Sequence, residues 1–214
     1  MMAMLLLVVA VLPAWSKWDF DKLARNAQLK YGGAASKMLG EIQTLFGNIK
    51  AQSETDKLKR VNEYFNRRIS FNDDSQIWNA PDYWATPLET IGKAAGDCED
   101  FAIIKYFSLK ELGIAPEKLR LSYVKAKIGG SNSTVSQAHM VLTYYASPDA
   151  EPLVLDNLIT DIRPASRRPD LTPVFSFNHE GIYAGSGTQP SGSIDRLSRW
   201  KDVLLRMQSE GIDF

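Results

Sequence analysis

The 214-residue chain has one cysteine, two histidines and no excess of either charge. A single cysteine excludes an internal disulfide. Lys plus Arg and Asp plus Glu number 25 each, and without a basic block nothing indicates charge-driven binding to nucleic acid or anionic lipid. No apolar run is long enough to span a bilayer. The length suits one domain with a sizeable core, so function must rest on local groups of residues.

An apolar run from Met4 to Leu12 opens the chain and is followed by the small residues Ala14 and Ser16. This order is typical of an export signal with its cleavage site, so we predict that residues 1–16 are a removable signal peptide. The first three residues carry no Lys or Arg, which leaves an apolar N-terminal arm as the alternative.

The hydrophobic periodicity changes along the chain. Between Phe20 and Ile69 apolar residues recur at helical spacing, which predicts three amphipathic helices. A capping box at Thr86 predicts a short helix, and a further helix is expected from Ile194 to about Gln208. After residue 117 the period becomes two, which predicts strands over 119–128, 138–145, 153–156 and 174–177.

These elements predict an α+β fold in a single domain over residues 17–214. We expect a helical part over about 17–113, an antiparallel sheet over about 117–183 and a C-terminal helix within about 193–210.

The single cysteine lies in the run Gly96-Asp97-Cys98-Glu99-Asp100, directly before a largely apolar stretch that stops at Gly113. This pattern predicts a buried helix with Cys98 in its first turn. The positive end of the helix dipole favours the thiolate, whereas the three neighbouring acids raise a thiol pKa. The acids therefore require an explanation of their own.

A base and an acid follow on predicted strands. His139 lies at the start of the second strand, and Asp156 ends the third. With Cys98 they make a nucleophile, base and orienting acid. The other histidine, His179, is predicted in a loop and is the weaker alternative for the base. Taken singly, a lone cysteine or a strand histidine is more often a core residue, so the hypothesis rests on the conjunction of the three.

Three segments carry a family resemblance: the run around Cys98 with its helix, the strand Ala138-His139-Met140-Val141-Leu142, and Leu153-Val154-Leu155-Asp156-Asn157. Together they resemble the bacterial transglutaminase-like cysteine proteinases over about residues 20 to 210. The resemblance implies a papain-like, transglutaminase-like core with a catalytic triad of Cys98, His139 and Asp156. It also implies a periplasmic endopeptidase that cuts near the N-terminus of a large surface adhesin and so disperses biofilm.

Calcium is the cofactor that the resemblance implies, with Asp97, Glu99 and Asp100 among its ligands. Clustered carboxylates suit this ion, and its charge would offset the field that opposes the thiolate. The alternative is that Asp97 and Asp100 only cap the helix. The resemblance also implies an inhibitory partner, the periplasmic domain of an inner-membrane cyclic-di-GMP receptor.

Two other functions share the same residues. An acyl transferase would pass the thioester to an amine instead of water. A binding module would keep the three residues as structural remnants without activity.

Overall fold

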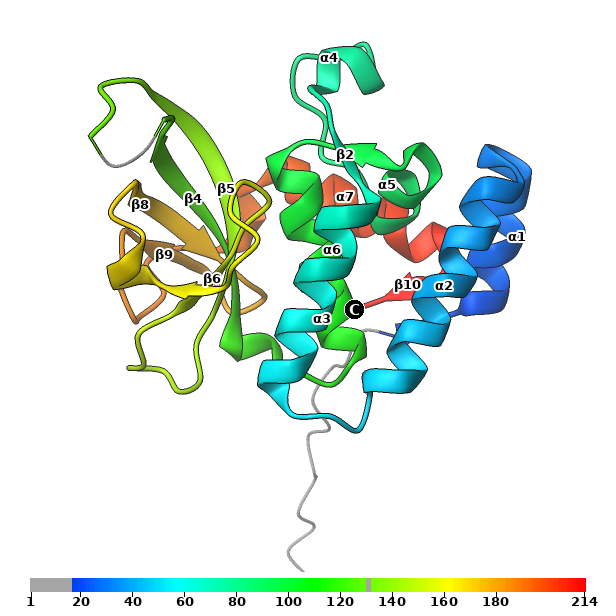
Figure 1. The fold of residues 1–214 in the computed structure, drawn as a ribbon, viewed down its shortest axis with the longest axis horizontal. Coiled ribbons are helices and arrows are strands. Elements are labelled where there is room, and N and C mark those ends of the chain that lie inside the picture. The colour runs from blue at the N-terminus through cyan, green and yellow to red at the C-terminus, as the bar shows by residue number, and fades with distance from the viewer. Residues whose placement is uncertain (1–16, 130–131) are drawn as a thin grey trace, which may run out of the picture.

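Helices lie on one side of a six-stranded antiparallel sheet in the computed structural model, which describes residues 17–129 and 132–214 (Figure 1). The predicted export signal at residues 1–16 lies outside the described residues. Within them, no helix is both long and apolar enough to cross a membrane.

The N-terminal third confirms the three predicted helices, α1 (Phe20–Tyr31), α2 (Gly33–Ile49) and α3 (Glu54–Arg68). Gly32 separates α1 from α2 with a φ of 84°, a left-handed value that glycine adopts without a Cβ clash. The Ser53 hydroxyl accepts the Asp56 N–H at 3.2 Å and begins α3, as its capping sequence predicts.

The next segment connects α3 to the central helix through short elements. The strands β2 (Ser70–Phe71) and β3 (Ala95–Gly96) pair in parallel. Between them lie α4 (Asp74–Ile77) and α5 (Pro87–Lys93), the latter begun by the predicted capping box at Thr86. The β2–β3 pairing holds the two ends of this segment together, immediately before the cysteine.

Helix α6 (Cys98–Glu111) is the centre of the molecule, in green in Figure 1. Its residues from Glu99 to Lys110 are all buried, because α3 and α5 pack on it from one side and β4 and β5 from the other. A helix that is apolar on most of its circumference is typical of a protein core.

The sheet has the strand order β7-β6-β5-β4-β8-β9, with every neighbouring pair antiparallel. It confirms the four predicted strands and adds two short edge strands. Two 3₁₀ helices, η1 (Pro116–Lys118) and η2 (Ala165–Arg167), precede β4 and follow β7. The strands are β4 (Leu119–Lys127), β5 (Ser136–Tyr144), β6 (Leu153–Leu155), β7 (Arg163–Pro164), β8 (Leu171–Phe177) and β9 (Ile182–Ala184).

Alternation along the strands divides the sheet side chains between two faces. Leu121, Met140 and Leu142 join the large core under α6. Val124, Val141 and Val154 form a separate small cluster on the other face.

The C-terminal segment closes the fold. A 3₁₀ helix, η3 (Ile194–Arg196), precedes α7 (Ser198–Glu210), and β10 (Ile212–Asp213) pairs with β1 (Lys17–Trp18). The predicted helix start at Ile194 was wrong, because the Ser193 hydroxyl accepts the Asp195 N–H and caps η3 instead. The main helix starts only at Ser198.

A buried cation in α6 leads to a stability prediction. Lys105 is 1% exposed, and burial lowers its pKa to about 7. In the unfolded chain the lysine pKa is about 10.4, so between these values folding releases a proton and stability increases with pH.

We therefore expect Lys105→Met to raise the free energy of unfolding at pH 7, with a gain that shrinks towards pH 10. Urea denaturation at both pH values would measure it, and Lys37→Met on the exposed face of α2 is the matched control. A gain that is equal at both pH values would contradict the assignment.

Candidate functional site

Backbone geometry places Cys98 at the start of α6. Asp100 accepts two backbone N–H groups: Ala85 N–H at 2.8 Å on Oδ1 and Asp97 N–H at 3.4 Å on Oδ2. Gly96 leaves the room for this contact, because a Cβ there would lie 2.7 Å from the Asp100 Cβ. The glycine and the acid thus hold the chain in the turn that presents Cys98 at the first helical position.

The thiol of Cys98 is partly buried and lies between an acid and a strand. It donates a hydrogen bond to Glu99 Oε2 at 3.0 Å and contacts the backbone of Met140, the residue after His139. Burial raises the pKa of the thiol, and the negative charges of Glu99 and Asp97 raise it further. The acids next to Cys98 therefore oppose the thiolate, as their sequence positions predict.

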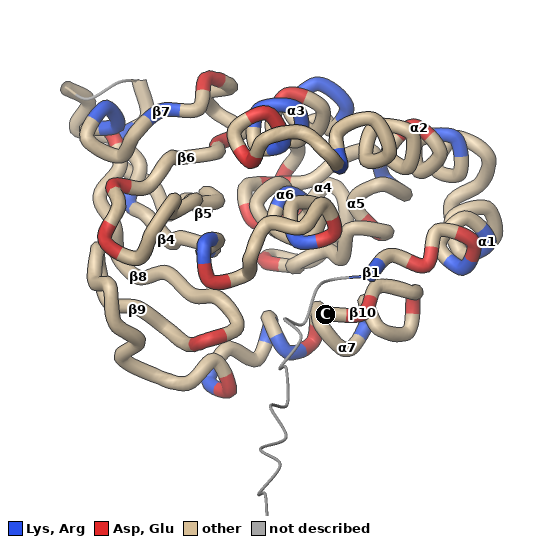
Figure 2. The backbone as a smooth tube through the Cα atoms, turned by 90° about the horizontal axis from the view of Figure 1, so that it is seen from below, with Lys and Arg blue, Asp and Glu red and all other residues tan. Residues whose placement is uncertain are grey.

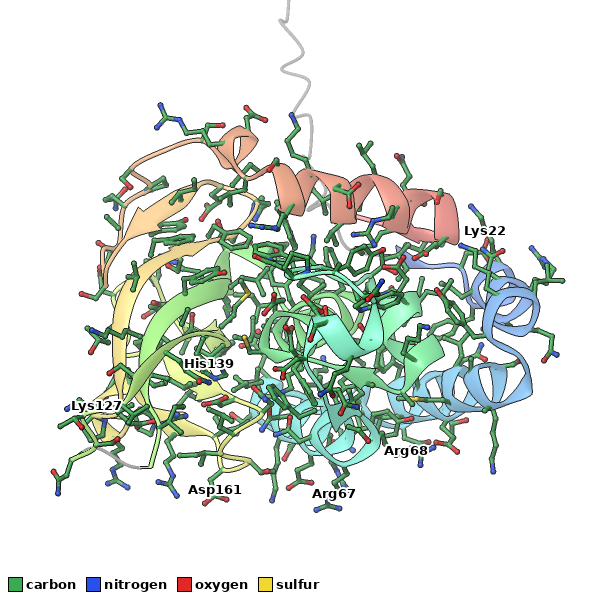
Figure 3. The ribbon with its side chains drawn as sticks, turned by 90° about the horizontal axis from the view of Figure 1, so that it is seen from above. Lys22, Arg67, Arg68, Lys127, His139 and Asp161 are labelled. Carbon is green, nitrogen blue, oxygen red and sulfur yellow. The ribbon has the colours of Figure 1, made fainter. Side chains whose placement is uncertain are left out.

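His139, which is labelled in Figure 3, lies in β5, and Asp156 directly follows the last residue of the neighbouring strand β6. The imidazole Nε2 lies 2.8 Å from Asp156 Oδ1, and the two side chains are 2% and 0% exposed. Because Nε2 faces the carboxylate, Nδ1 is left for another partner. The structure thus joins two of the predicted site residues directly, and it brings the thiol of the third to the backbone next to His139.

A fourth residue, Arg168, completes this arrangement. It donates from Nη2 to Asp156 Oδ2 at 2.7 Å and also binds the Asp170 carboxylate. Burial alone would raise the pKa of Asp156, but the hydrogen bonds from His139, Leu158 N–H and Arg168 lower it to about 2. Sequence reasoning missed Arg168, because an arginine in a connection between strands gives no sign of its partner.

The acidic residues near Cys98 form a larger cluster than the sequence predicts. Carboxylate oxygens from different acids lie within 4.8 Å of one another in two all-carboxylate groups, one of Asp74, Asp82 and Glu99 and one of Asp74, Asp97 and Asp100. The predicted set of Asp97, Glu99 and Asp100 is therefore linked through Asp74. Asp74 and Asp82 come from the segment between β2 and β3, far from Cys98 in sequence, and were missed.

The chemistry of this cluster fits a hard divalent cation. Asp74, Asp82 and Asp97 each have one buried carboxylate oxygen without a hydrogen-bond partner among the described residues. Burial raises the pKa of Asp97 to about 9, with further contributions from Glu99 and Asp100, and raises the pKa of Asp74 to about 6. Unpartnered, destabilised carboxylates are the oxygen ligands that calcium takes.

The alternative base, His179, is exposed in the loop after β8. The charged groups around it are Glu180, Lys110 and Glu117. Lys110 lies near the C-terminal end of α6, opposite the end that carries Cys98. The structure therefore separates His179 from the site.

Comparison with known proteins agrees with this geometry. Residues 42–169 match the family model described as bacterial transglutaminase-like cysteine proteinase, whereas the comparison with curated proteins found no match. Among solved structures, Legionella pneumophila LapG is 38% identical with a TM-score of 0.74, over 88% of this chain and 97% of that one. Its EGTA-treated form matches with a TM-score of 0.77 and the same coverage, at 38% identity.

The calcium-bound form of Legionella pneumophila LapG matches with a TM-score of 0.74 and 38% identity, over 88% of this chain and 98% of that one. The family model covers more than half of the chain, and the solved relatives cover most of it. This chain therefore belongs to the bacterial transglutaminase-like cysteine proteinases.

Proposed function

We propose that the protein is a calcium-dependent cysteine endopeptidase with Cys98 as nucleophile, His139 as general base and acid, and Asp156 as orienting acid. The observation that carries the proposal is the buried His139–Asp156 hydrogen bond of 2.8 Å, next to the strand residue Met140 that the thiol contacts. The same residue types serve as nucleophile, base and orienter in other hydrolases.

The proposed reaction has two steps. His139 takes the proton of Cys98, and the sulfur attacks the carbonyl carbon of the scissile amide. The C–N bond breaks, the amine leaves with the proton from His139, and a thioester remains. A water molecule then gives a proton to His139 and attacks the thioester carbon. The C–S bond breaks, the carboxylic acid leaves, and His139 returns the proton to the sulfur, which restores the thiol.

The acidic cluster determines how the thiol can be activated. Glu99 accepts the thiol hydrogen bond and thereby favours the neutral form of Cys98. Bound calcium would supply positive charge that offsets these acids, with ligands from Asp74, Asp82, Asp97, Glu99 and Asp100. The calcium-bound form of Legionella pneumophila LapG, a relative at 38% identity, supports this cofactor.

The family resemblance read from the sequence extends the proposal to a substrate and a compartment. The protein would act in the periplasm on the N-terminal region of a large surface adhesin, and so release the adhesin and disperse biofilm. The periplasmic domain of an inner-membrane cyclic-di-GMP receptor would inhibit it by binding. Incubation with such an adhesin fragment, with and without calcium, and mass spectrometry of the products test the proposal.

The triad gives the first prediction for activity. Cys98→Ala and His139→Ala should each lower the rate of peptide cleavage by at least about a thousandfold, because the members of a triad act as a unit. His179→Ala is the control and should cleave at the normal rate. Cleavage that survives in Cys98→Ala would disprove the assignment, and an amine adduct in place of cut peptides would indicate an acyl transferase.

Arg168 gives a second prediction, as a residue that positions Asp156. Arg168→Gln should lower kcat by up to about a hundredfold, because a small displacement of the catalytic geometry has that effect. Since Arg168 helps to lower the pKa of Asp156, the acid limb of the pH profile should move to higher pH.

Arg168→Lys keeps the charge and should restore part of the rate and the position of the acid limb. Circular dichroism would verify that each variant is folded, because removing one partner of a buried ion pair costs about 3–5 kcal/mol. If the rate falls but the acid limb of the pH profile stays at the same pH, Arg168 has only a structural role.

Calcium gives a third prediction. A chelator should abolish cleavage, and calcium at about 100 times its dissociation constant should add about 2.7 kcal/mol to the free energy of unfolding. Asp74→Asn and Asp82→Asn should each weaken calcium binding at least about tenfold in calorimetric titration, because each removes a ligand charge. Asp202→Asn, at an exposed acid on α7, is the control and should bind normally.

A further inference from the structure

A groove of about 470 Å³ borders the acid of the proposed triad. The end of β4, the loop after β6 and the segment from β7 to β8 form its walls. We call it the flanking groove, and its main lining residues are Lys127, Ile128, Leu158, Ile159, Arg163 and Arg167.

The flanking groove is continuous with the catalytic network through two residues. Leu158 lines the groove, and its backbone N–H donates to Asp156 Oδ1 at 3.1 Å. Arg168 also lines it and donates to Asp156 Oδ2 at 2.7 Å. In Figure 3 Lys127, which lines the groove, and Asp161, which pairs with Arg163, lie nearer the lower edge of the view than His139. The groove therefore adjoins the residues that hold Asp156, the partner of His139.

Two side chains of α3 hold the loop after β6, which forms one wall of the flanking groove. Asn66 of α3 donates to the Asp156 carbonyl oxygen at 2.7 Å, and Asn62 donates to the Thr160 carbonyl oxygen at 2.8 Å. Both amides are anchored in a helix that packs on α6. The flanking groove is thus formed before any ligand arrives, which lowers the entropic cost of binding.

Apolar side chains in the flanking groove are unusually open to solvent. Leu158 is 49% exposed and Ile128 is 37% exposed, although both are large hydrophobic residues. They come from different loops and line the same groove. Their exposure would be reduced by an apolar side chain bound between them.

The charge of the flanking groove is mostly positive. Lys127, Arg163, Arg167 and Arg168 line it, against Asp170, which is already bound by Arg168. Figure 2 shows Lys and Arg positions at β7 and in the turn beside it.

Two of the arginines bear directly on an anionic ligand. Arg163 pairs with Asp161 at 3.2 Å, but these side chains are 43% and 79% exposed, and such a surface pair is weak and exchangeable. Within the described chain, the buried Nη1 of Arg168 has no hydrogen-bond partner. Arg167 also lines the groove and is exposed, so a carboxylate there could pair with Arg167 and take the place of Asp161 on Arg163.

We propose that the flanking groove is a substrate subsite that binds an apolar residue next to an acidic residue, on one side of the scissile bond. This inference rests on the proposed endopeptidase function and specifies the protein segment it accepts. Ile128 and Leu158 would contact the apolar side chain, and Arg163 and Arg167 would pair with the carboxylate. Because the groove lies on the Asp156 side of the site, the acidic preference is confined to one side of the cut.

Labelled decapeptides test the subsite. Each contains a central Ala-Ala pair, the cut site that the family resemblance implies, with either Leu-Glu or Leu-Lys on one flank. The four versions cover both flanks and both charges. Fluorescence polarisation with the Cys98→Ala variant measures binding without turnover, and mass spectrometry with the active protein measures cleavage. One Leu-Glu peptide should bind at least about tenfold more tightly than its Leu-Lys counterpart, with no such difference on the other flank.

Charge reversal supplies the decisive comparison. The double variant Arg163→Glu with Arg167→Glu should remove or invert the preference for Leu-Glu over Leu-Lys. It should raise KM for the Leu-Glu peptide about tenfold while kcat stays within about twofold. Arg25→Glu with Lys37→Glu, on exposed positions of α1 and α2, changes the net charge equally and should leave the preference intact.

The outcomes separate the two levels of the proposal. Equal binding of all four peptides, or a preference that survives the charge reversal, would overturn the subsite. A clear binding preference without cleavage of any peptide would retain the subsite and overturn the endopeptidase function.

Discussion

Helix α6 is buried on all sides, and this burial determines where the first turn of the helix, and therefore Cys98, can lie. The turn needs partners for its unpaired N–H groups and space for a tight approach. Asp100 supplies the first and Gly96 the second. The consequence is a thiol at the junction of a helix and a sheet, in a position where it touches the strand that carries His139.

Two groups of charged residues meet at this junction, one around Asp156 and one beside Cys98, and the pKa values of their carboxyl groups shift in opposite directions. Asp156 is surrounded by donors, since His139, Leu158 N–H and Arg168 all bind its carboxylate, and its pKa falls accordingly. The acids beside Cys98 are surrounded by one another, and burial together with neighbouring negative charge raises the pKa values of Asp97 and Asp100. In the first group, the chain itself supplies the hydrogen-bond donors that stabilise the carboxylate of Asp156. In the proposed function a bound cation would stabilise the ionised form of the second group, and metal binding would then affect the state of the thiol.

The segment from Asp156 to Arg168 connects the proposed catalytic network to the protein surface. Its first residue, Asp156, belongs to the network, the exposed Leu158 follows two residues later, and Arg168 at its end binds the same carboxylate. A substrate bound along this loop would therefore contact the groups that orient His139. In the proposed function, specificity and the positioning of His139 would thus depend on the same short segment.

The sequence by itself determined most of the elements, because local signals set them: capping at Ser53 and Thr86, the helix at Cys98, and the two-residue period of β4 and β5. It also indicated Cys98, His139 and Asp156 as a set, since their order and chemistry are visible along the chain. It failed at the start of α7, where a 3₁₀ turn competed for Ser193.

Only the tertiary structure brought Asp74 and Asp82 to the acids at Cys98 and Arg168 to Asp156. These contacts join segments that show no periodic pattern in the sequence. A charged side chain in a loop can have many partners in water, and its partner is determined only when packing buries it and the charge must be paired.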